Sequence, residues 1–191
     1  MIKTSKIIKK LAFFGDGEAG PEDKHYQLAY RTAILLAKNG YITINGGGPG
    51  VMLASTLGAE EVNGRVEVVV VDKTKQPKGN YEGQSDLNIK LADKVFNEIN
   101  YLNRIGELIE VADAFLIFKG GTGTIAELGY AWSMAKFDYG HHEPVILVGK
   151  GWKRIINKLR RFLNLEKKEM EVIHFANNEQ EVLKILKTIS R

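Results

Sequence analysis

Eight consecutive residues, from Gly120 to Glu127, combine the residue types needed to hold a phosphorylated ligand and act on it. They read Gly-Gly-Thr-Gly-Thr-Ile-Ala-Glu and lie between an apolar run and a helical pattern. The first peptide N–H groups of a helix lack intrahelical partners and the helix dipole is positive there, so backbone alone can bind a phosphate. No Gly-Lys-Ser/Thr follows, unlike in a Walker A motif, so NTP hydrolysis is not expected. The expected phosphate turn comprises Gly120, Gly121, Thr122, Gly123 and Thr124.

Glu127 has two interpretations that its spacing leaves equal. Thr124-x-x-Glu127 matches a capping box, in which the glutamate side chain bonds back to the first residue of the helix. Alternatively, the carboxylate stands above the phosphate turn and takes part in chemistry on the ligand.

A second glycine-rich turn, Gly15-x-Gly17-x-x-Gly20, matches the dinucleotide-binding fingerprint. That fold also needs a carboxylate at the end of the second strand to bind the ribose hydroxyls. Asn45 and a run of glycines stand there instead, so we expect neither NAD nor FAD. Gly15, Asp16 and Gly17 form either part of the wall of a smaller nucleotide site or a tight turn that only avoids clashes.

The third turn, Gly46-Gly47-Gly48-Pro49-Gly50-Val51-Met52, follows the second expected strand. Glycines let a backbone approach a ligand where any side chain would block it. The alternative is a sharp reversal into the next helix. We expect the ligand to meet Gly46, Gly47, Gly48 and Met52.

These turns are positioned by apolar runs that alternate with helical patterns, which indicates parallel βαβ units. The expected strands are 7–15, 41–45, 65–72, 86–95, 113–118, 144–148 and 172–175. The expected helices are 21–39, 51–62, 98–111, 124–137, 152–163 and 179–189, and the polar segment 73–85 is expected to be a mobile loop. The pattern predicts one Rossmann-like, doubly wound α/β domain over residues 1–191, with helices on both faces of a parallel sheet. All three glycine turns should then converge on the carboxyl edge of the sheet.

Composition excludes several kinds of site. The chain has no cysteine, which excludes disulfides, thiolate nucleophiles and cysteine-based zinc sites, and its four histidines lack metal-ligand spacing on a helix. The net charge of +4 is spread along the sequence, so we expect small anions rather than nucleic acid as partners. No apolar run reaches the ~18 residues of a membrane span and the start of the chain lacks a signal-peptide pattern, so we expect a cytoplasmic protein without a membrane partner.

At these motifs the chain resembles the LONELY GUY (LOG) family, formerly described as lysine decarboxylases. The hallmark of that family is Pro-Gly-Gly-x-Gly-Thr-x-x-Glu, with an arginine on the preceding helix. Residues 120–127 keep it except for the Pro, which is Lys119 here, and the arginine matches Arg104. The family's Gly-Gly-Gly-x-x-Gly turn matches 46–52, with its last glycine displaced to Gly50. The similarity runs from about residue 11 to residue 149.

The resemblance implies a homodimer that hydrolyses nucleoside 5′-monophosphates at the N-glycosidic bond. It makes Arg104 and Glu127 the catalytic pair and residues 121–124 the phosphate cradle, with no metal or cofactor. Apolar residues on several faces of the helices that carry this pair also favour a dimer there; they are Ile105, Leu108, Ile109, Leu128, Ala131 and Trp132. A non-catalytic nucleotide-binding protein or molybdenum-cofactor carrier of the same fold is the alternative.

Four positions depart from the pattern of the family members that act on cytokinin nucleotides or from the hallmark itself. They are Lys119, Ile105, Thr122 and Ala126. The base that the site accepts is therefore left open by the sequence, although Arg104 and Glu127 persist.

Overall fold

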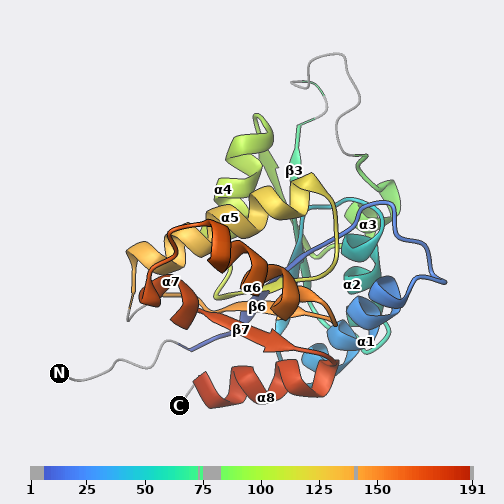
Figure 1. Ribbon diagram of the computed structural model, residues 1–191. Coiled ribbons are helices and arrows are strands. Elements are labelled where there is room, and N and C mark those ends of the chain that lie inside the picture. The colour runs from blue at the N-terminus through green and yellow to red at the C-terminus, as the bar shows by residue number, and fades with distance from the viewer. Residues whose placement is uncertain (1–6, 73, 75–82, 140–141, 190–191) are drawn as a thin grey trace.

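Seven short strands form one sheet in which every neighbouring pair runs parallel (Figure 1). The computed structural model describes residues 7–72, 74, 83–139 and 142–189. The strand order is β4-β3-β2-β1-β5-β6-β7, which confirms the expected doubly wound α/β fold. The strands are β1 (Lys10–Phe14), β2 (Ile42–Asn45), β3 (Val66–Val71), β4 (Lys94–Glu98), β5 (Ala114–Ile117), β6 (Val145–Val148) and β7 (Ile173–Ala176).

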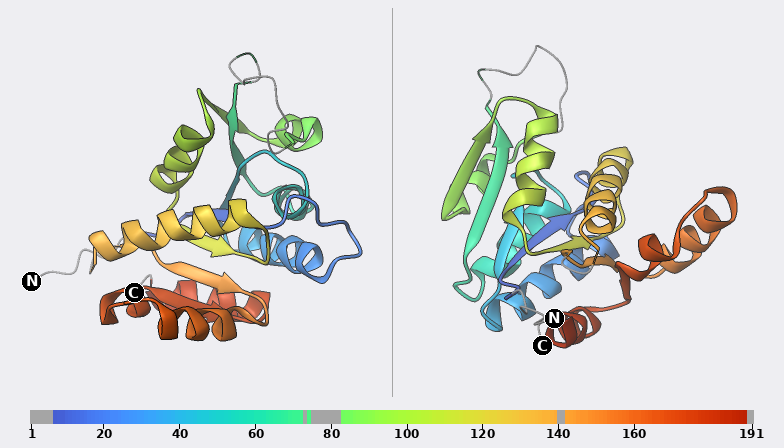
Figure 2. Two further views of the ribbon diagram at one scale, coloured as in Figure 1. Left: turned by 45° about the horizontal axis from the view of Figure 1, so that its top comes forward. Right: turned by 90° about the vertical axis from the view of Figure 1, so that its left-hand side faces the viewer.

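Helices cover both faces of this sheet (Figure 2). One face carries α1 (Lys24–Lys38), α2 (Val51–Glu60), α3 (Asp86–Leu91) and α8 (Glu179–Ile189). The other carries α4 (Tyr101–Val111), α5 (Thr122–Phe137), α6 (Trp152–Phe162) and the short α7 (Lys167–Glu171). Right-handed crossovers between parallel strands produce this two-sided arrangement.

The sheet is apolar on both faces because helices bury both of them. Along β1, Leu11 and Phe13 pack on the α1 side while Ala12 and Phe14 pack on the α4 side. This alternation follows from the two-residue period of a strand. Each fully buried Leu or Phe side chain contributes roughly 1.5–3 kcal/mol, so the core fixes the register of the strands that end at the glycine turns.

The order of the strands reverses between β1 and β5. The chain adds β2, β3 and β4 on one side of β1, and β5, β6 and β7 on the other. Past the strand ends the ladder continues, since Phe118 N–H donates to the carbonyl of Phe14 at 2.8 Å and Asp16 N–H donates to that of Lys119 at 3.0 Å. Ligands of open α/β sheets bind at the carboxyl ends of the strands beside such a reversal.

The expectation of a strand over 86–95 is wrong in its first half. Residues 86–91 form α3, and β4 begins only at Lys94. Ser85 starts this helix, because its hydroxyl accepts a hydrogen bond from the N–H of Asn88 at 3.2 Å. That N-cap overrides the weak strand pattern of the segment. Most of the expected mobile loop, 73–85, lies outside the described residues.

Two smaller differences concern helices. The first helix begins at Lys24 rather than Pro21, because Asp23 occupies its N-cap. The helix α7 was not expected; a capping box between Glu166 and Glu169 starts it, and Trp132 Nε1 donates to the carbonyl of Glu169 at 2.6 Å.

Within the described part of the chain, no helix has both the length and the apolar character needed to cross a membrane.

Candidate functional site

The phosphate turn lies at the first turn of α5, directly after β5. Gly121 is the N-cap, and the first intrahelical bond runs from the N–H of Ile125 to the carbonyl of Gly121 at 3.1 Å. The N–H groups of Thr122, Gly123 and Thr124 therefore precede the hydrogen-bonded ladder of the helix. Gly121 and Thr122 are exposed, so an anion can reach this turn from solvent.

The two glycines that open the turn differ in their surroundings. A Cβ at Gly120 would lie 2.1 Å from the hydroxyl of Thr124 and 2.9 Å from the backbone N of Asp16, so packing requires a glycine there. A Cβ at Gly121 would meet nothing within 4 Å, and its φ of −94° suits any residue. The protein itself leaves open space in front of Gly121, where the dipole of α5 favours an anion.

Glu127 does not form the capping box that was one of its two interpretations. Because α5 begins at Thr122, Thr124 is its third residue and Glu127 its sixth, too far along to bond back to the N-cap. Its side chain is only 5% exposed. Glu127 lies three residues after the buried Thr124, and residues at that spacing share a helix face. The carboxylate is thus held on the buried side of the phosphate turn.

Arg104 enters the same edge of the sheet from α4, which packs against α5. Its side chain is 4% exposed. Nη2 donates to the carbonyl of Gly46 at 3.0 Å, and Nε donates to the carbonyl of Val69 at 3.1 Å. A Cβ at Gly46 would lie 1.7 Å from Nη2, so this glycine makes room for the guanidinium. Arg104 therefore links the turn after β2 to the middle of β3.

A buried polar network supports the Gly46–Gly48 turn from behind. The amide of Asn45 donates to Thr56 Oγ1 at 2.8 Å, and its Oδ1 accepts from the N–H of Gly47 at 2.8 Å. Asn88 donates to Asn45 Oδ1 at 3.1 Å and to the carbonyl of Gly48 at 2.8 Å. A dinucleotide-binding fold places its ribose-binding carboxylate at this position. Here the side chain of Asn45 bonds within the protein and stabilises the turn instead. The network fixes the loop through satisfied buried groups.

The turn after β1 abuts the other two turns. Gly50 has φ +64°, and a Cβ there would lie 2.1 Å from the carbonyl oxygen of Asp16. That oxygen accepts from the N–H of Val51 at 2.9 Å, and a Cβ at Gly15 would lie 2.7 Å from the same valine. The carboxylate of Asp16 lies 3.2 Å from His25 Nε2.

The structure therefore brings the three glycine turns together at the sheet edge where the sequence placed them. Gly120 meets Asp16, Gly50 meets Asp16 and Gly17, and Gly48 meets Met52. The backbone of the turns after β1 and β2 is largely bonded within the protein, whereas the start of α5 faces open space.

Four polar residues near the site were not predicted from the sequence; they are His25, Ser55, Thr56 and Asn88. Only Asn88 could have been found, because Ser85 three residues before it is a recognisable N-cap. Among the described residues, no group of His, Cys, Asp or Glu side chains has the arrangement of a metal site.

Comparisons with solved structures show the same fold at low sequence identity. The molybdenum cofactor binding protein of Rippkaea orientalis superimposes with a TM-score of 0.71 at 18% identity, covering 98% of this chain and 100% of that one. The molybdenum cofactor carrier protein of Chlamydomonas reinhardtii gives 0.68 at 18% identity, covering 95% and 98%. DNA processing protein A of Helicobacter pylori, described as binding single-stranded DNA, gives 0.63 at 17% identity, covering 98% and 84%.

Sequence comparison gives the family. An uncharacterised protein of Archaeoglobus fulgidus is 29% identical over 142 residues, which are 74% of this chain and 85% of the relative. The model of the SLOG cluster4 family matches residues 9–183. The match covers the sheet and the three glycine turns. It supports membership of the SLOG/LOG-like superfamily but does not confirm the narrower LOG family that the motifs resemble. The chain belongs to the SLOG cluster4 family.

Proposed function

We propose that the protein hydrolyses nucleoside 5′-monophosphates at the N-glycosidic bond, giving a free base and ribose 5-phosphate. The observation that carries the proposal is the position of Glu127. A carboxylate 5% exposed lies five residues after an N-cap whose open side can take a phosphate. The first turn of α5 lies beside the place where the ribose of a bound monophosphate would lie, which puts this carboxylate next to the sugar in the proposed complex.

The chemistry needs one negative group near the sugar. Breaking the ribose–base bond builds positive charge on C1′ of the ribose and negative charge on the departing base. Glu127 binds the ribose hydroxyls, stabilises the oxocarbenium-like sugar and orients the attacking water. The phosphate, held by the amides of residues 122–124, fixes the sugar against this carboxylate.

Arg104 acts mainly by position in this scheme. Two of its nitrogens donate to the backbone carbonyls of Gly46 and Val69, so its guanidinium shapes the pocket wall. Its positive charge at the carboxyl edge offsets part of the charge of the phosphate. The resemblance to the LOG family supports the same pair of residues.

A second candidate is a non-catalytic carrier of a nucleotide or of a pterin-type phosphate ligand. The observation that favours it is the likeness, over nearly the full length of both chains, to the two proteins described as binding or carrying molybdenum cofactor. The helix start of α5 would bind the phosphate of such a ligand equally well. In that case Glu127 would orient the ligand without turnover.

One experiment separates the two candidates. The protein is incubated with AMP, GMP, CMP and UMP in turn, and free base is measured by chromatography while binding is measured by calorimetry. Release of base from at least one monophosphate supports the hydrolase. Binding without any release of base contradicts the hydrolase and supports the carrier.

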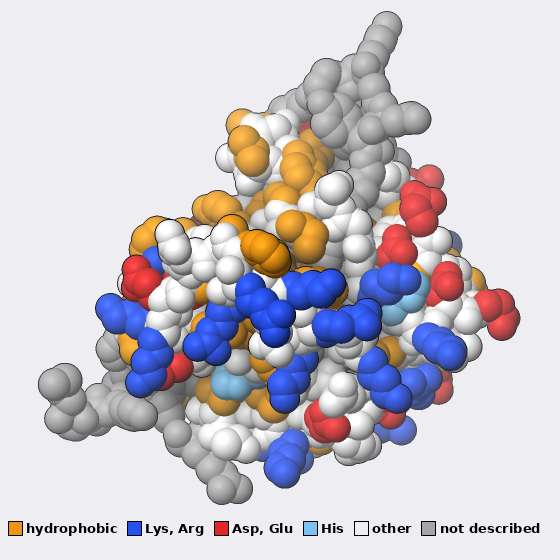
Figure 3. All heavy atoms as spheres, in the orientation of Figure 1, with side chains coloured by type: hydrophobic (Ala, Val, Ile, Leu, Met, Phe, Trp, Pro, Cys, Tyr) orange, Lys and Arg blue, Asp and Glu red, His pale blue; other side chains and the backbone are white. Residues whose placement is uncertain are grey.

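We also propose a homodimer that uses α4 and α5, but with other residues than the sequence suggested. Five of the six apolar residues put forward for the interface are buried in the core of the monomer against the sheet; they are Ile105, Leu108, Ile109, Leu128 and Ala131. Different apolar side chains of this region are exposed, namely Leu102, Ile125, Tyr130 and Phe137. Figure 3 shows hydrophobic side chains gathered over α4 and α5. Light scattering at micromolar concentration tests the dimer, and a monomer mass contradicts it.

A further inference from the structure

The outer face of α6 carries a high density of positive charge. The helix spans residues 152–162 and contains five Lys or Arg residues and no Asp or Glu; the five are Lys153, Arg154, Lys158, Arg160 and Arg161. All five are exposed. At 1.5 Å per residue the helix is about 16 Å long, so the charges lie within a short distance of one another. Figure 3 shows Lys and Arg side chains crossing the middle of the view, over α6.

These charges are not neutralised by neighbouring carboxylates. Elsewhere Lys10, Lys136 and Lys167 each have an acidic partner within 3.4 Å. Within the described part of the chain, no ion pair involves any of the five basic residues of α6. Crowding like charges without counter-charges is unfavourable for an isolated protein. An anionic partner would remove this repulsion.

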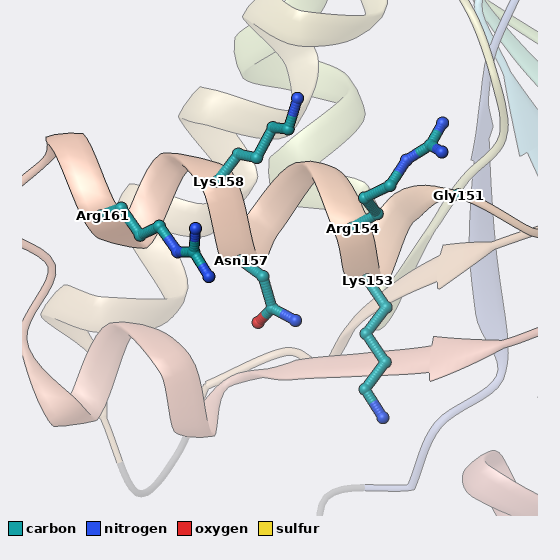
Figure 4. Close-up of a pocket in the computed structure, with 6 residues that line it drawn as sticks. All are labelled: Gly151, Lys153, Arg154, Asn157, Lys158 and Arg161. Atoms are coloured by element: carbon teal, nitrogen blue, oxygen red, sulfur yellow. The ribbon is translucent and has the colours of Figure 1, made fainter.

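The charges border a shallow groove. A depression of about 530 Å³ lies on this helix, lined by Gly151, Lys153, Arg154, Asn157, Lys158 and Arg161. In Figure 4, Arg154 and Lys158 extend to one side of α6, whereas Lys153, Asn157 and Arg161 extend to the other. Arg154 and Lys158 are four residues apart, about 6 Å along the axis. The groove therefore lies between two rows of cationic side chains.

The apolar residues of α6 decide which polyanion fits. Trp152 and Ile156 are buried against the sheet, which leaves Ile155 and Phe162 as the exposed apolar side chains of the helix, a smaller apolar face than that of a helix that inserts into a lipid surface. Phe162, at the end of the basic rows, is 85% exposed. A basic groove with an exposed aromatic ring is the combination that binds single strands, because unpaired bases stack on the ring while cations follow the backbone.

We propose that the outer face of α6 binds single-stranded nucleic acid. The phosphates lie in the groove between the rows of Arg154 and Lys158 on one side and Lys153 and Arg161 on the other, and a base stacks on Phe162. This partner differs from the small anions that the spread of charge along the sequence suggested. The difference arises because five of the nine residues 153–161 are basic and exposed on one helix, a local excess that the net charge of the chain conceals. The proposal is independent of the hydrolase, whose site is built by α4, α5 and the glycine turns.

The test measures fluorescence anisotropy of a labelled oligothymidylate of about 16 nucleotides across a range of salt concentrations. The parent protein should bind, with the logarithm of the binding constant falling by roughly 0.7 per phosphate contact for each unit of log salt. The double variant Arg154→Glu, Lys158→Glu should bind at least about tenfold more weakly, and its salt slope should be shallower by about 1.4. The matched control is Lys184→Glu, Lys187→Glu on α8, which changes the net charge equally and should bind more tightly than the α6 variant.

Phe162→Ala separates stacking from charge. It should weaken binding about tenfold, as for the loss of one stacked base, while the salt slope stays the same. Thermal melting checks the fold, and if the double variant melts early then Arg154→Gln, Lys158→Gln replaces it.

The proposal is overturned if the parent does not bind the oligonucleotide, or if the α6 and α8 variants lose affinity equally. It is also overturned if only phosphatidylserine vesicles or polyglutamate bind in a manner that depends on α6. Monophosphate binding should be unchanged in all α6 variants, which keeps this test separate from that of the hydrolase.

Discussion

The two edges of the sheet differ in how their backbone N–H groups are bonded. At the amino edge, carboxylates satisfy the backbone where strands begin: Asp113 accepts from the N–H groups of Lys9 and Lys10, at 3.0 and 2.8 Å, and Asp93 accepts from that of Val66 at 2.7 Å. At the carboxyl edge, the side chains of Asn45 and Asn88 bond the backbone of the Gly46–Gly48 turn, but the glycine turn before α5 has no such side chain. Between β5 and α5 the N–H groups at the helix start face open space instead of a side-chain acceptor.

This difference separates stability from function. An edge whose donors are capped by its own carboxylates has nothing to offer an anion, whereas uncapped helix N–H groups attract one. The positions of the two buried glutamates agree with this separation, because Glu67 lies near the amino edge, where it pairs with Lys10 at 2.8 Å, and Glu127 lies beside the proposed phosphate turn. Changes at the carboxyl edge should therefore alter ligand binding and turnover, and changes at the amino edge should alter folding.

The largest effect is expected for Glu127→Gln. Removing the charge that stabilises an oxocarbenium-like sugar should lower the rate of base release by ~10² or more. The melting temperature should stay close to that of the parent, because Gln keeps the shape of the side chain and one acceptor oxygen, and Glu127 does not cap α5. Assays of base release and thermal melting measure both quantities. Unchanged turnover in the variant would show that Glu127 has no catalytic role.

Glu67→Gln tests the amino edge. The side chain of Glu67 is 1% exposed and contacts Lys10 and Arg65, which are 30% and 56% exposed. Because solvent screens both partners, losing the charge should reduce the free energy of unfolding by about 1–3 kcal/mol rather than by the 3–5 kcal/mol of a fully buried pair. Urea denaturation measures the loss. Monophosphate binding should be unaffected, and a large loss of binding would break the separation between the edges.

Gly121→Ala should weaken ligand binding without a large loss of stability, the reverse of Glu67→Gln. The added methyl group enters the open space where the phosphate is expected, so affinity for AMP should fall at least about tenfold, or 1.4 kcal/mol. The free energy of unfolding should change by less than about 1 kcal/mol, because the backbone at Gly121 is unstrained for alanine but alanine is a poorer N-cap than glycine. Calorimetry and denaturation give the two values.

Gly129→Ala is the matched control for this variant. A Cβ at Gly129 also meets nothing within 4 Å, and the residue lies further along the same helix. Gly129→Ala should gain about 0.5–1 kcal/mol of stability, as is typical inside a helix, without losing affinity. Equal affinity loss in both variants would show that Gly121 does not face the ligand.

The smallest expected effect is a dependence of folding stability on pH. It is due to two histidines, His142 just before β6 and His174 in β7. Burial lowers the pKa of His142 and of His174 below the ordinary value of 6.5, and His142 adds to the lowering at His174. Glu143 and Asp138 oppose the shift at His142.

The unfolded chain therefore binds more protons than the folded one as pH falls from about 6.5 through the lowered pKa values, and stability decreases in that window. Urea denaturation between about pH 7 and pH 5 should show this decrease, and His174→Gln should make it smaller. A decrease of the same size in the variant would exclude His174 as its source.

Much of this architecture is local enough to be predicted from the sequence. Continuous apolar runs at 113–118 and 144–148 contain β5 and β6, because a strand buried on both faces needs apolar residues at every position. The glycine turns were placed at the correct edge, because the carboxyl ends of parallel strands meet there. The segment 86–95 was predicted poorly, because a single N-cap at Ser85 decided between helix and strand.

The sequence by itself thus determined the sheet, its polarity and the turns that gather on one edge of it, since these follow from periodicity and from glycine. Tertiary structure alone decided the role of each polar side chain. Only the packing of α4 on β3 and β4 directs Arg104 to backbone carbonyls, and only the start of α5 at Thr122 moves Glu127 out of a capping box. The charged face of α6 is likewise a tertiary property, because burial of Trp152 and Ile156 fixes which side of the helix meets solvent. Long-range contacts set these outcomes, and spacing along the chain carries no record of them.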